Sequence, residues 1–293
     1  MMSLISVDNL TKRYGRRTGV VGLDFNVPAG AMFGFLGPNG AGKTTTIRVL
    51  LGFLRPTGGK AGVFGLNTWR DSARIKAEVG YVPGDLRFYP WLTCKSALKI
   101  FGQVRGRDLM PAGAELSQDF DLDPDVRVRS MSRGMRQKLG LILALVHEPR
   151  LLVLDEPTAS LDPLMQKKLY DHLRSLVSAG HTVFFSSHTL SEVEQLCDHV
   201  VILREGKLVA DETLENLRAR ARRDVTIVWQ DSVKLDAVTV PGFIDVYERH
   251  NRQWSASLTG SATELIRWGA QQPIEDLTIG QPDLARLFEQ YYE

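Results

Sequence analysis

A glycine-rich loop at residues 37–44 has the residue types of a phosphate-binding site. The segment Gly-Pro-Asn-Gly-Ala-Gly-Lys-Thr fits the pattern G-x4-G-K-[ST], between an apolar strand and an expected helix. Glycines let successive backbone N–H groups turn toward an anion, and the following helix presents its positive end to the same phosphates. We expect Lys43 to bridge the β- and γ-phosphates of a nucleotide and the Thr44 hydroxyl to bind Mg²⁺. The predicted nucleotide contacts here are Gly37, Pro38, Asn39, Gly40, Ala41, Gly42, Lys43, Thr44 and Thr45.

Two adjacent carboxylates, Asp155 and Glu156, follow an apolar strand at 151–154. Taken alone, such a pair most often begins a solvated loop. Beside a phosphate loop it has a chemical interpretation, because successive side chains at a strand end point to opposite sides of the sheet. Asp155 suits the Mg²⁺ shell together with Thr44, and Glu156 suits the orientation and polarisation of an attacking water. Glu156 and Lys43 are therefore predicted catalytic residues.

The elements that must position these side chains alternate along the chain. We expect short strands at 3–9 and 19–27 around a turn-rich stretch at 11–15. Further strands are expected at 31–36, 79–82, 151–154, 182–185 and 199–203, and helices at 43–54 and 164–176. Fully apolar strands that alternate with helices indicate an α/β domain with a buried parallel sheet. Residues 88–148 contain several helical segments and no convincing strand, which indicates a helical insertion.

The length of 293 residues favours two domains, at a prior of about 150 residues each. We expect a first domain at 1–215 with its helical subdomain at about 88–148, a basic linker at 216–223, and a small α+β domain at 224–293. Residues 224–293 hold 5 Lys and Arg against 11 Asp and Glu, which leaves 31 against 23 in residues 1–223. A basic first domain suits a polyphosphate ligand.

Three further motifs follow the phosphate loop in order. They are Ser132-Arg133-Gly134-Met135-Arg136-Gln137, then Pro157-Thr158-Ala159-Ser160-Leu161-Asp162-Pro163, then Ser186-Ser187-His188. Each has a structural alternative. Ser132 could simply cap an amphipathic helix, His188 could be a packed or exposed histidine, and Tyr14 could be an ordinary strand-edge tyrosine.

Together these motifs resemble those of the ATP-binding-cassette (ABC) ATPases, the nucleotide-binding subunits of transporters, over about residues 3–215. The resemblance implies a P-loop NTPase cassette with a mostly parallel core sheet, an antiparallel β subdomain and a helical insertion. It implies ATP and Mg²⁺ as cofactors, and two chains that enclose two ATP molecules head to tail, here as a homodimer. The resemblance also assigns roles. Ser132, Gly134 and Asp162 join the nucleotide contacts, with Ser132 and Gly134 acting across the dimer. His188 contacts the γ-phosphate as a third predicted catalytic residue, and Tyr14 stacks on adenine.

The C-terminal segment resembles that of the ATPases serving ABC-2-type exporters. This resemblance implies a separate transmembrane permease, which docks on the helical insertion near residues 87–93, and a peripheral location at the cytoplasmic face of the membrane. No nucleic-acid partner is expected. Two alternatives stay open: a soluble ABC ATPase that acts on ribosomes or DNA, and the ATPase subunit of an importer. The former usually carries two fused cassettes or a long coiled-coil insertion, and this chain has neither.

Two positions depart from the pattern that the sequence resembles. Gly84 stands where the family usually has Gln, sometimes Glu, near Mg²⁺ and the water, so either the neighbouring Asp85 or a water takes that place. Arg133 stands where glycine is common. Neither departure removes Lys43, Asp155 or Glu156, so we expect a working ATPase.

Composition excludes several other classes. The net charge of +2 does not indicate a nucleic-acid binder. Cys94 and Cys197 have no neighbouring Cys or His at zinc-site spacing, so a disulfide framework or a zinc site is poorly supported. The N-terminus lacks the pattern of a signal peptide, and no apolar run approaches the roughly 18 residues of a membrane span. We therefore expect that the chain does not cross a membrane by itself.

Overall fold

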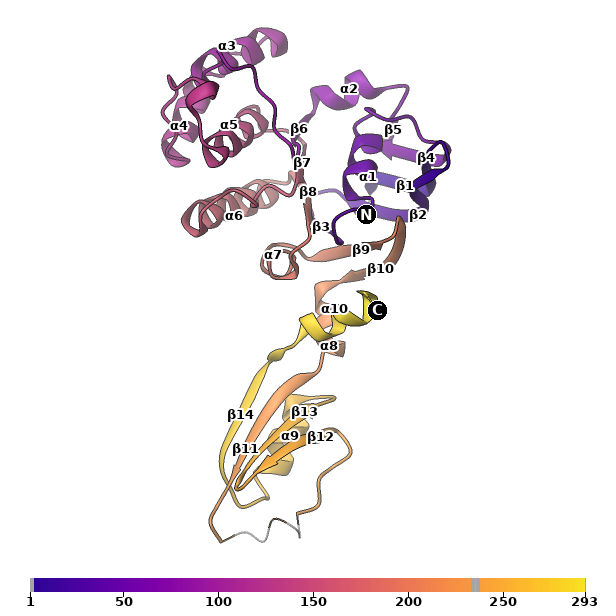
Figure 1. The fold of residues 1–293 in the computed structure, drawn as a ribbon, viewed down its shortest axis with the longest axis vertical. Coiled ribbons are helices and arrows are strands. Elements are labelled where there is room, and N and C mark those ends of the chain that lie inside the picture. The colour runs from indigo at the N-terminus through magenta and orange to yellow at the C-terminus, as the bar shows by residue number, and fades with distance from the viewer. Residues whose placement is uncertain (1–2, 233–234, 236–237, 293) are drawn as a thin grey trace. The chain divides into compact units, whose positions relative to one another are not determined.

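The computed structural model describes residues 3–232, 235 and 238–292 (Figure 1). The outermost residues of the two predicted domains (1, 2 and 293) lie outside those ranges. The packing of the chain divides it into two units, residues 1–211 and 212–293, which are described separately below.

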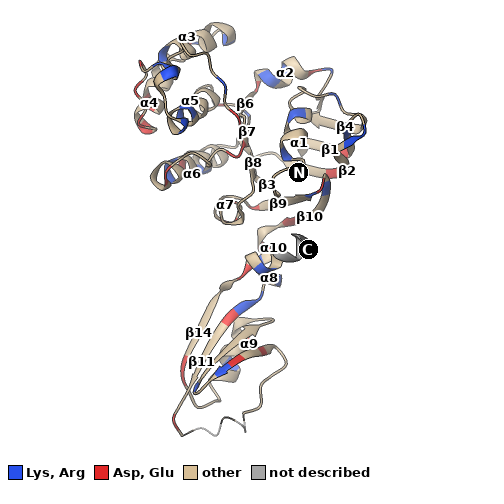
Figure 2. Ribbon diagram, in the orientation of Figure 1, with Lys and Arg blue, Asp and Glu red and all other residues tan. Residues whose placement is uncertain are grey.

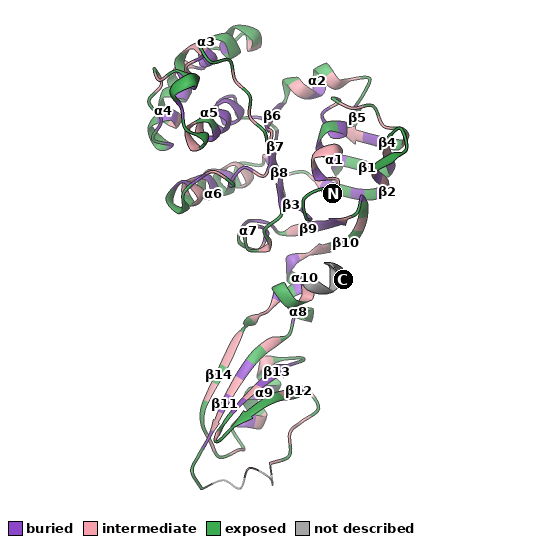
Figure 3. Ribbon diagram, viewed as in Figure 1, coloured by how far each residue is buried: buried purple, intermediate pink, exposed green. Residues whose placement is uncertain are grey.

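The first unit is built on a six-stranded sheet with the order β10-β9-β3-β8-β7-β6 (Figure 1). Strands β9, β3, β8, β7 and β6 run parallel to one another, and every residue of β3, β7 and β8 is buried (Figure 3). The buried parallel sheet predicted from the apolar runs is confirmed. The strands are β3 (Met32–Leu36), β6 (Val79–Val82), β7 (Leu151–Asp155), β8 (Thr182–Ser187), β9 (His199–Arg204) and β10 (Lys207–Thr213).

Four helices of this unit lie outside the helical insertion: α1 (Lys43–Leu50), α2 (Ser72–Ala77), α6 (Pro163–Ser178) and α7 (Leu190–Leu196). Helix α1 ends four residues before the predicted end at 54. Gly52 follows it with φ 66°, and a Cβ atom there would lie 2.3 Å from the Thr68 carbonyl oxygen. Only glycine fits this left-handed turn, so the chain leaves the helix at this point.

A second, antiparallel sheet with the order β2-β1-β4-β5 is formed by strands from the first 67 residues. Its strands are β1 (Ser3–Tyr14), β2 (Arg17–Pro28), β4 (Gly58–Val63) and β5 (Leu66–Asn67). The predicted turn at 11–15 is too long, because β1 pairs with β2 up to Tyr14 and Arg17. Strand β4 was not predicted, because its sequence Gly-Gly-Lys-Ala-Gly-Val lacks the β-branched and aromatic residues typical of strands.

The helical insertion contains α3 (Cys94–Arg105), α4 (Met110–Asp119), a 3₁₀ turn (Val128–Ser130) and α5 (Arg133–Leu145). Helix α3 begins with a capping box, in which the Thr93 side chain accepts from the Ser96 amide and the Ser96 hydroxyl accepts from the Thr93 amide. Such a cap contributes roughly 1 kcal/mol and fixes the start of the helix.

The second unit is a four-stranded antiparallel sheet with the order β12-β13-β11-β14. Trp229, Trp254 and Trp268 meet edge to face in its core, with ring centroids 5.0 and 6.2 Å apart. Charged residues occur along its strands and helices (Figure 2). One ion pair joins Asp224 Oδ1 and Arg286 Nη1 at 3.1 Å. The elements are α8 (Leu214–Arg220), β11 (Arg223–Trp229), β12 (Ile244–His250), β13 (Gln253–Leu258), α9 (Ala262–Gly269), β14 (Ile274–Pro282) and α10 (Leu284–Tyr292).

The predicted basic linker, residues 216–223, lies in α8 and at the start of β11. The Thr213 hydroxyl accepts from the Asn216 amide and caps α8, so the first part of this stretch, up to Arg220, is helical.

Candidate functional site

The glycine loop runs from the buried strand β3 into α1 and needs its glycines. Gly40 and Gly42 have φ angles of 83° and 107°, in the left-handed region that favours glycine. A Cβ atom on Gly37 would lie 2.5 Å from the Leu203 carbonyl oxygen of the neighbouring strand β9. The loop can therefore turn its backbone amides toward one point at the N-terminus of α1, which is the geometry of an anion site.

Lys43 lies at the centre of this loop and is only 4% exposed. Its Nζ donates to the carbonyl oxygens of Gly37 (2.6 Å) and Pro38 (3.2 Å) and lies 3.1 Å from Glu156 Oε1. The ammonium group is thus held among oxygen acceptors by the loop itself. These are the partners that a phosphate would have to replace.

Asp155 ends β7 and is 2% exposed. Its Oδ2 accepts from the Thr44 hydroxyl at 2.8 Å, and its Oδ1 accepts from the Ser186 hydroxyl at 2.7 Å. A hydroxyl and a carboxylate are the hard oxygen donors that Mg²⁺ prefers, and Mg²⁺ commonly takes one or two protein ligands plus phosphate oxygens and waters. Among the described residues, no group of three or more His, Cys, Asp and Glu could hold a metal ion. The pair of Thr44 and Asp155 therefore fits a metal that arrives with a nucleotide.

Glu156 links the loop to the end of β8. Its Oε1 faces Lys43, and its Oε2 lies 3.2 Å from His188 Nδ1. Its backbone has φ 53°, a left-handed conformation that costs a non-glycine residue on the order of 1 kcal/mol. The amide of Glu156 donates to the Ser186 carbonyl oxygen at 3.1 Å, which helps to hold this conformation. The structure thus brings Lys43, Glu156 and His188 together.

A cavity of about 450 Å³ opens beside the loop. Tyr14 lines it, is 44% exposed, and has its hydroxyl 3.5 Å from Thr45 Oγ1. The sequence did not single out Arg17, Thr18 or Arg48, which also line the cavity, because they occur in no motif. The predicted residues among its lining are Tyr14, Asn39, Gly40, Gly42, Lys43, Thr44, Thr45 and Glu156.

Six predicted nucleotide contacts lie outside this lining: Gly37, Pro38 and Ala41 of the loop itself, and Ser132, Gly134 and Asp162 elsewhere in the chain. The Ser132 hydroxyl caps α5 by accepting from the Met135 amide at 3.1 Å, and Asp162 caps α6 in the same way through the Met165 amide at 3.0 Å. Gly134 lets α5 approach the loop before α6, because a Cβ atom there would lie 2.9 Å from the Ser160 carbonyl oxygen. Within one chain, the described lining of the cavity does not include Ser132, Gly134 or Asp162.

Gly84 adjoins Asp155, the predicted metal carboxylate. A Cβ atom at this position would lie 3.8 Å from Asp155 Oδ2. The neighbouring Asp85 is turned to Arg87 instead, with its Oδ2 2.9 Å from Nε and 2.8 Å from Nη2. Of the two alternatives for this position, the structure therefore gives no support to Asp85 as the replacement.

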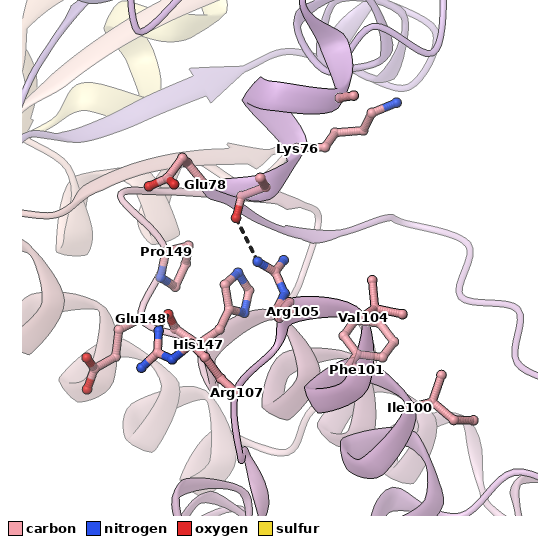
Figure 4. A pocket seen from close by; sticks show the side chains of 12 residues that line it. Lys76, Glu78, Ile100, Phe101, Val104, Arg105, Arg107, His147, Glu148 and Pro149 are labelled. Atoms are coloured by element: carbon pink, nitrogen blue, oxygen red, sulfur yellow. Dashed lines mark hydrogen bonds between the residues drawn. The ribbon is translucent and has the colours of Figure 1, made fainter.

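A larger cavity of about 700 Å³ lies on the helical insertion, between α2, α3 and residues 147–149 (Figure 4). Arg105 crosses it and donates from Nη1 to the Ala77 carbonyl oxygen at 2.7 Å. Burial lowers the pKa of Arg105 from its ordinary value, opposed by the nearby Glu78. Burial, with the charge of Arg105, lowers the pKa of His147 to about 4, so His147 is neutral near pH 7.

The fold and the loop define a nucleotide-binding cassette of the ABC type. The family described as ABC transporter matches residues 20–159. The bacitracin transport ATP-binding protein BcrA of Bacillus licheniformis is 39% identical, over 85% of this chain and 83% of that protein. The daunorubicin resistance ATP-binding protein DrrA3 of Streptomyces coeruleorubidus is 37% identical, over 97% and 94%. A solved ATP-binding subunit of an ABC transporter is 28% identical with a TM-score of 0.70, over 74% of this chain and 92% of that one.

The chain belongs to the ABC transporter ATP-binding proteins, in the group of ABC-2-type exporters, and both predictions are confirmed. It binds a nucleotide and is an ATPase subunit of a transporter. Within the described residues, no helix combines the length and the apolar character that a membrane crossing needs.

Proposed function

We propose that two copies of this chain enclose two Mg²⁺–ATP molecules head to tail and drive a separate permease from the cytoplasmic face of a membrane. The observation that supports this is the division of the site within one chain. Lys43, Asp155 and Glu156 surround the glycine loop, whereas Ser132 and Gly134 lie at a capped helix start outside that cavity. A second copy can supply the missing half.

The residues around the loop have distinct roles in this proposal. Lys43 exchanges its carbonyl and carboxylate partners for the β- and γ-phosphates. Glu156, released from Lys43, orients the attacking water and accepts its proton, and His188 contacts the γ-phosphate. Thr44 and Asp155 would hold Mg²⁺, which when bound neutralises charge that develops on the phosphates.

The N-terminus of α5 completes the site of the other copy. Its first amides and the exposed Ser132 hydroxyl form a positive helix end that suits a γ-phosphate. Dimer closure therefore depends on the third phosphate, and hydrolysis to ADP removes the group that joins the copies. ATP binding and hydrolysis thereby close and reopen the dimer.

The groove beside α3 is the proposed docking site for the permease. Ile100, Phe101 and Val104 line it and are 41%, 39% and 83% exposed. Nearby, Tyr89 and Trp91 stack at 5.8 Å and are 69% and 57% exposed, which supports the predicted docking near residues 87–93. The occupant is a short amphipathic segment of the permease, because exposed apolar side chains of this number usually mark an interface.

The named relatives support export as the direction of transport. BcrA is named for bacitracin transport and DrrA3 for daunorubicin resistance. We therefore propose that the permease exports a compound of the antibiotic type.

The division of the site is tested at Ser132. Ser132→Asp retains a good helix cap but places a carboxylate against the γ-phosphate of the other copy. We expect ATPase activity to fall at least tenfold, while the monomer still binds ATP. Ser132→Asn is the matched control, because it keeps the cap without the charge, and should retain most of the activity. Wild-type turnover by Ser132→Asp would mean that this helix end does not contact a nucleotide.

A further inference from the structure

Ser186 is a fully buried hydroxyl residue at the end of β8, directly beside Asp155 in the parallel register. Its Oγ donates to Asp155 Oδ1 at 2.7 Å. Thr44 donates to the other oxygen, so the described residues give this carboxylate one hydroxyl donor on each oxygen. The two donors differ, because Ser186 is completely enclosed whereas Thr44 is partly exposed on the phosphate loop.

The same serine also contacts the second carboxylate residue. The Glu156 amide lies 3.1 Å from the Ser186 carbonyl oxygen and 3.3 Å from Ser186 Oγ. This amide belongs to the residue with the left-handed backbone, φ 53°. Ser186 therefore contacts the side chain of Asp155 and the backbone of Glu156 at once.

We propose that Ser186 is a positioning residue that fixes the two carboxylates relative to each other. Its hydroxyl holds one oxygen of Asp155 and leaves the oxygen beside Thr44 for the metal. Its acceptor atoms hold the Glu156 peptide, so that the Glu156 side chain stays between Lys43 and His188. This assignment rests on the Mg²⁺–nucleotide site proposed above.

The glycine at position 84 supports this role of Ser186. Position 84 adjoins Asp155 but has no side chain that could orient the carboxylate, and Asp85 is paired with Arg87. The task of orienting Asp155 therefore falls on β8 and the phosphate loop. A buried carboxylate with one donor fewer would be free to rotate toward other partners.

The test is the effect of Mg²⁺ on nucleotide affinity, measured with a fluorescent ATP analogue in Mg²⁺ and in EDTA, next to thermal denaturation. The Mg²⁺ gain is the ratio of the nucleotide affinity in Mg²⁺ to that in EDTA. In Ser186→Ala this ratio should be about tenfold smaller than in the wild type, because a hydrogen bond to a charged group is of that strength. Its affinity in EDTA should stay within about twofold of the wild type. Ser186→Thr, which restores a hydroxyl, should recover the gain.

Thr182→Val is the matched control. It removes a buried hydroxyl from the other end of β8, where Thr182 accepts from the Gly30 amide at 2.8 Å, and it should lower the melting temperature without changing the Mg²⁺ gain. If Ser186→Ala does not fold, Ser186→Cys fills nearly the same volume with a poor donor and is judged by the same criterion.

A folded Ser186→Ala or Ser186→Cys with the wild-type Mg²⁺ gain would overturn the assignment, whatever its melting temperature, because the serine would then serve the strand alone. A wild-type protein without any Mg²⁺ gain would overturn the metal site and the assignment together, so the two failures are distinguishable.

Discussion

At the residue scale, Lys43 and Glu156 neutralise each other in this structure. Their contact of 3.1 Å, with that of His188 to the same carboxylate, leaves the catalytic groups bonded to one another. In the proposed mechanism a nucleotide separates them, because Lys43 binds the phosphates and Glu156 orients the water. The arrangement therefore keeps Lys43 and Glu156 on each other until a nucleotide provides other partners.

The grouping of Lys43, Asp155 and Glu156 around one loop could be predicted from the sequence, because glycines at fixed spacing before Lys and Thr, with a strand-end acid pair, are typical of a phosphate site. The hydrogen bonds of Ser186 and the position of Arg48 in the cavity lining could not be predicted. Ser186 stands in the motif Ser186-Ser187-His188, but that motif does not give its hydrogen bonds, which depend on which strands become neighbours. Such contacts are visible only once β7 and β8 lie side by side.

The residue that departs from the family pattern leads to a prediction. A side chain at position 84 would begin 3.8 Å from Asp155 Oδ2, so Gly84→Gln would place an amide at the metal carboxylate. We expect ATPase activity to reach half-maximum at a severalfold lower Mg²⁺ concentration.

The matched control for position 84 is Asp85→Asn. It should leave the Mg²⁺ dependence unchanged, since Asp85 is paired with Arg87 and exposed. A change in Asp85→Asn and none in Gly84→Gln would reverse the assignment of this position.

At the scale of elements, the strands of the parallel sheet could be predicted from their apolar sequences. Those of the antiparallel sheet could be predicted only in part. Strand β4 contains three glycines, and one of them, Gly59, has φ 70° with no room for a Cβ atom beside Asn9. Tertiary packing rather than propensity places this strand. The end of α1 was missed for a similar reason, because Gly52 looks like any other glycine in the sequence.

The proposed permease-docking site on helix α3 leads to a prediction for Val104. Val104 is 83% exposed at the edge of the larger groove, so Val104→Asp should leave the fold, nucleotide binding and basal ATPase activity intact. It should weaken co-purification with the permease at least tenfold, because an apolar contact is replaced by a charge.

Ile266→Asp is the control, since Ile266 is 55% exposed on α9, outside the groove. Equal loss of the permease in both variants would show that the groove is not the docking site.

At the scale of the whole molecule, the near-zero net charge hides two unlike units. Lys and Arg outnumber Asp and Glu in residues 1–223, whereas Asp and Glu outnumber Lys and Arg in residues 224–293, a segment with its own tryptophan core. Among the described residues, all of the proposed catalytic groups lie in the cassette. The cassette also contains both halves of a nucleotide site without uniting them, and this is the central reason to expect a dimer that ATP closes.

The proposed ATP-dependent dimer is tested most directly by the mass of Glu156→Gln in solution, measured with and without Mg²⁺–ATP. Removing the carboxylate that activates water should stop hydrolysis and leave ATP bound between two chains. Light scattering should then give twice the chain mass of 32.7 kDa with ATP and a single chain mass after exchange into ADP.

The matched control is Glu148→Gln, because Glu148 also has a left-handed backbone, φ 51°, but lines the other cavity. It should hydrolyse ATP at the wild-type rate and accumulate no trapped dimer. A Glu156→Gln protein that turns over ATP at the wild-type rate, or that binds ATP and stays at 32.7 kDa, would contradict the account.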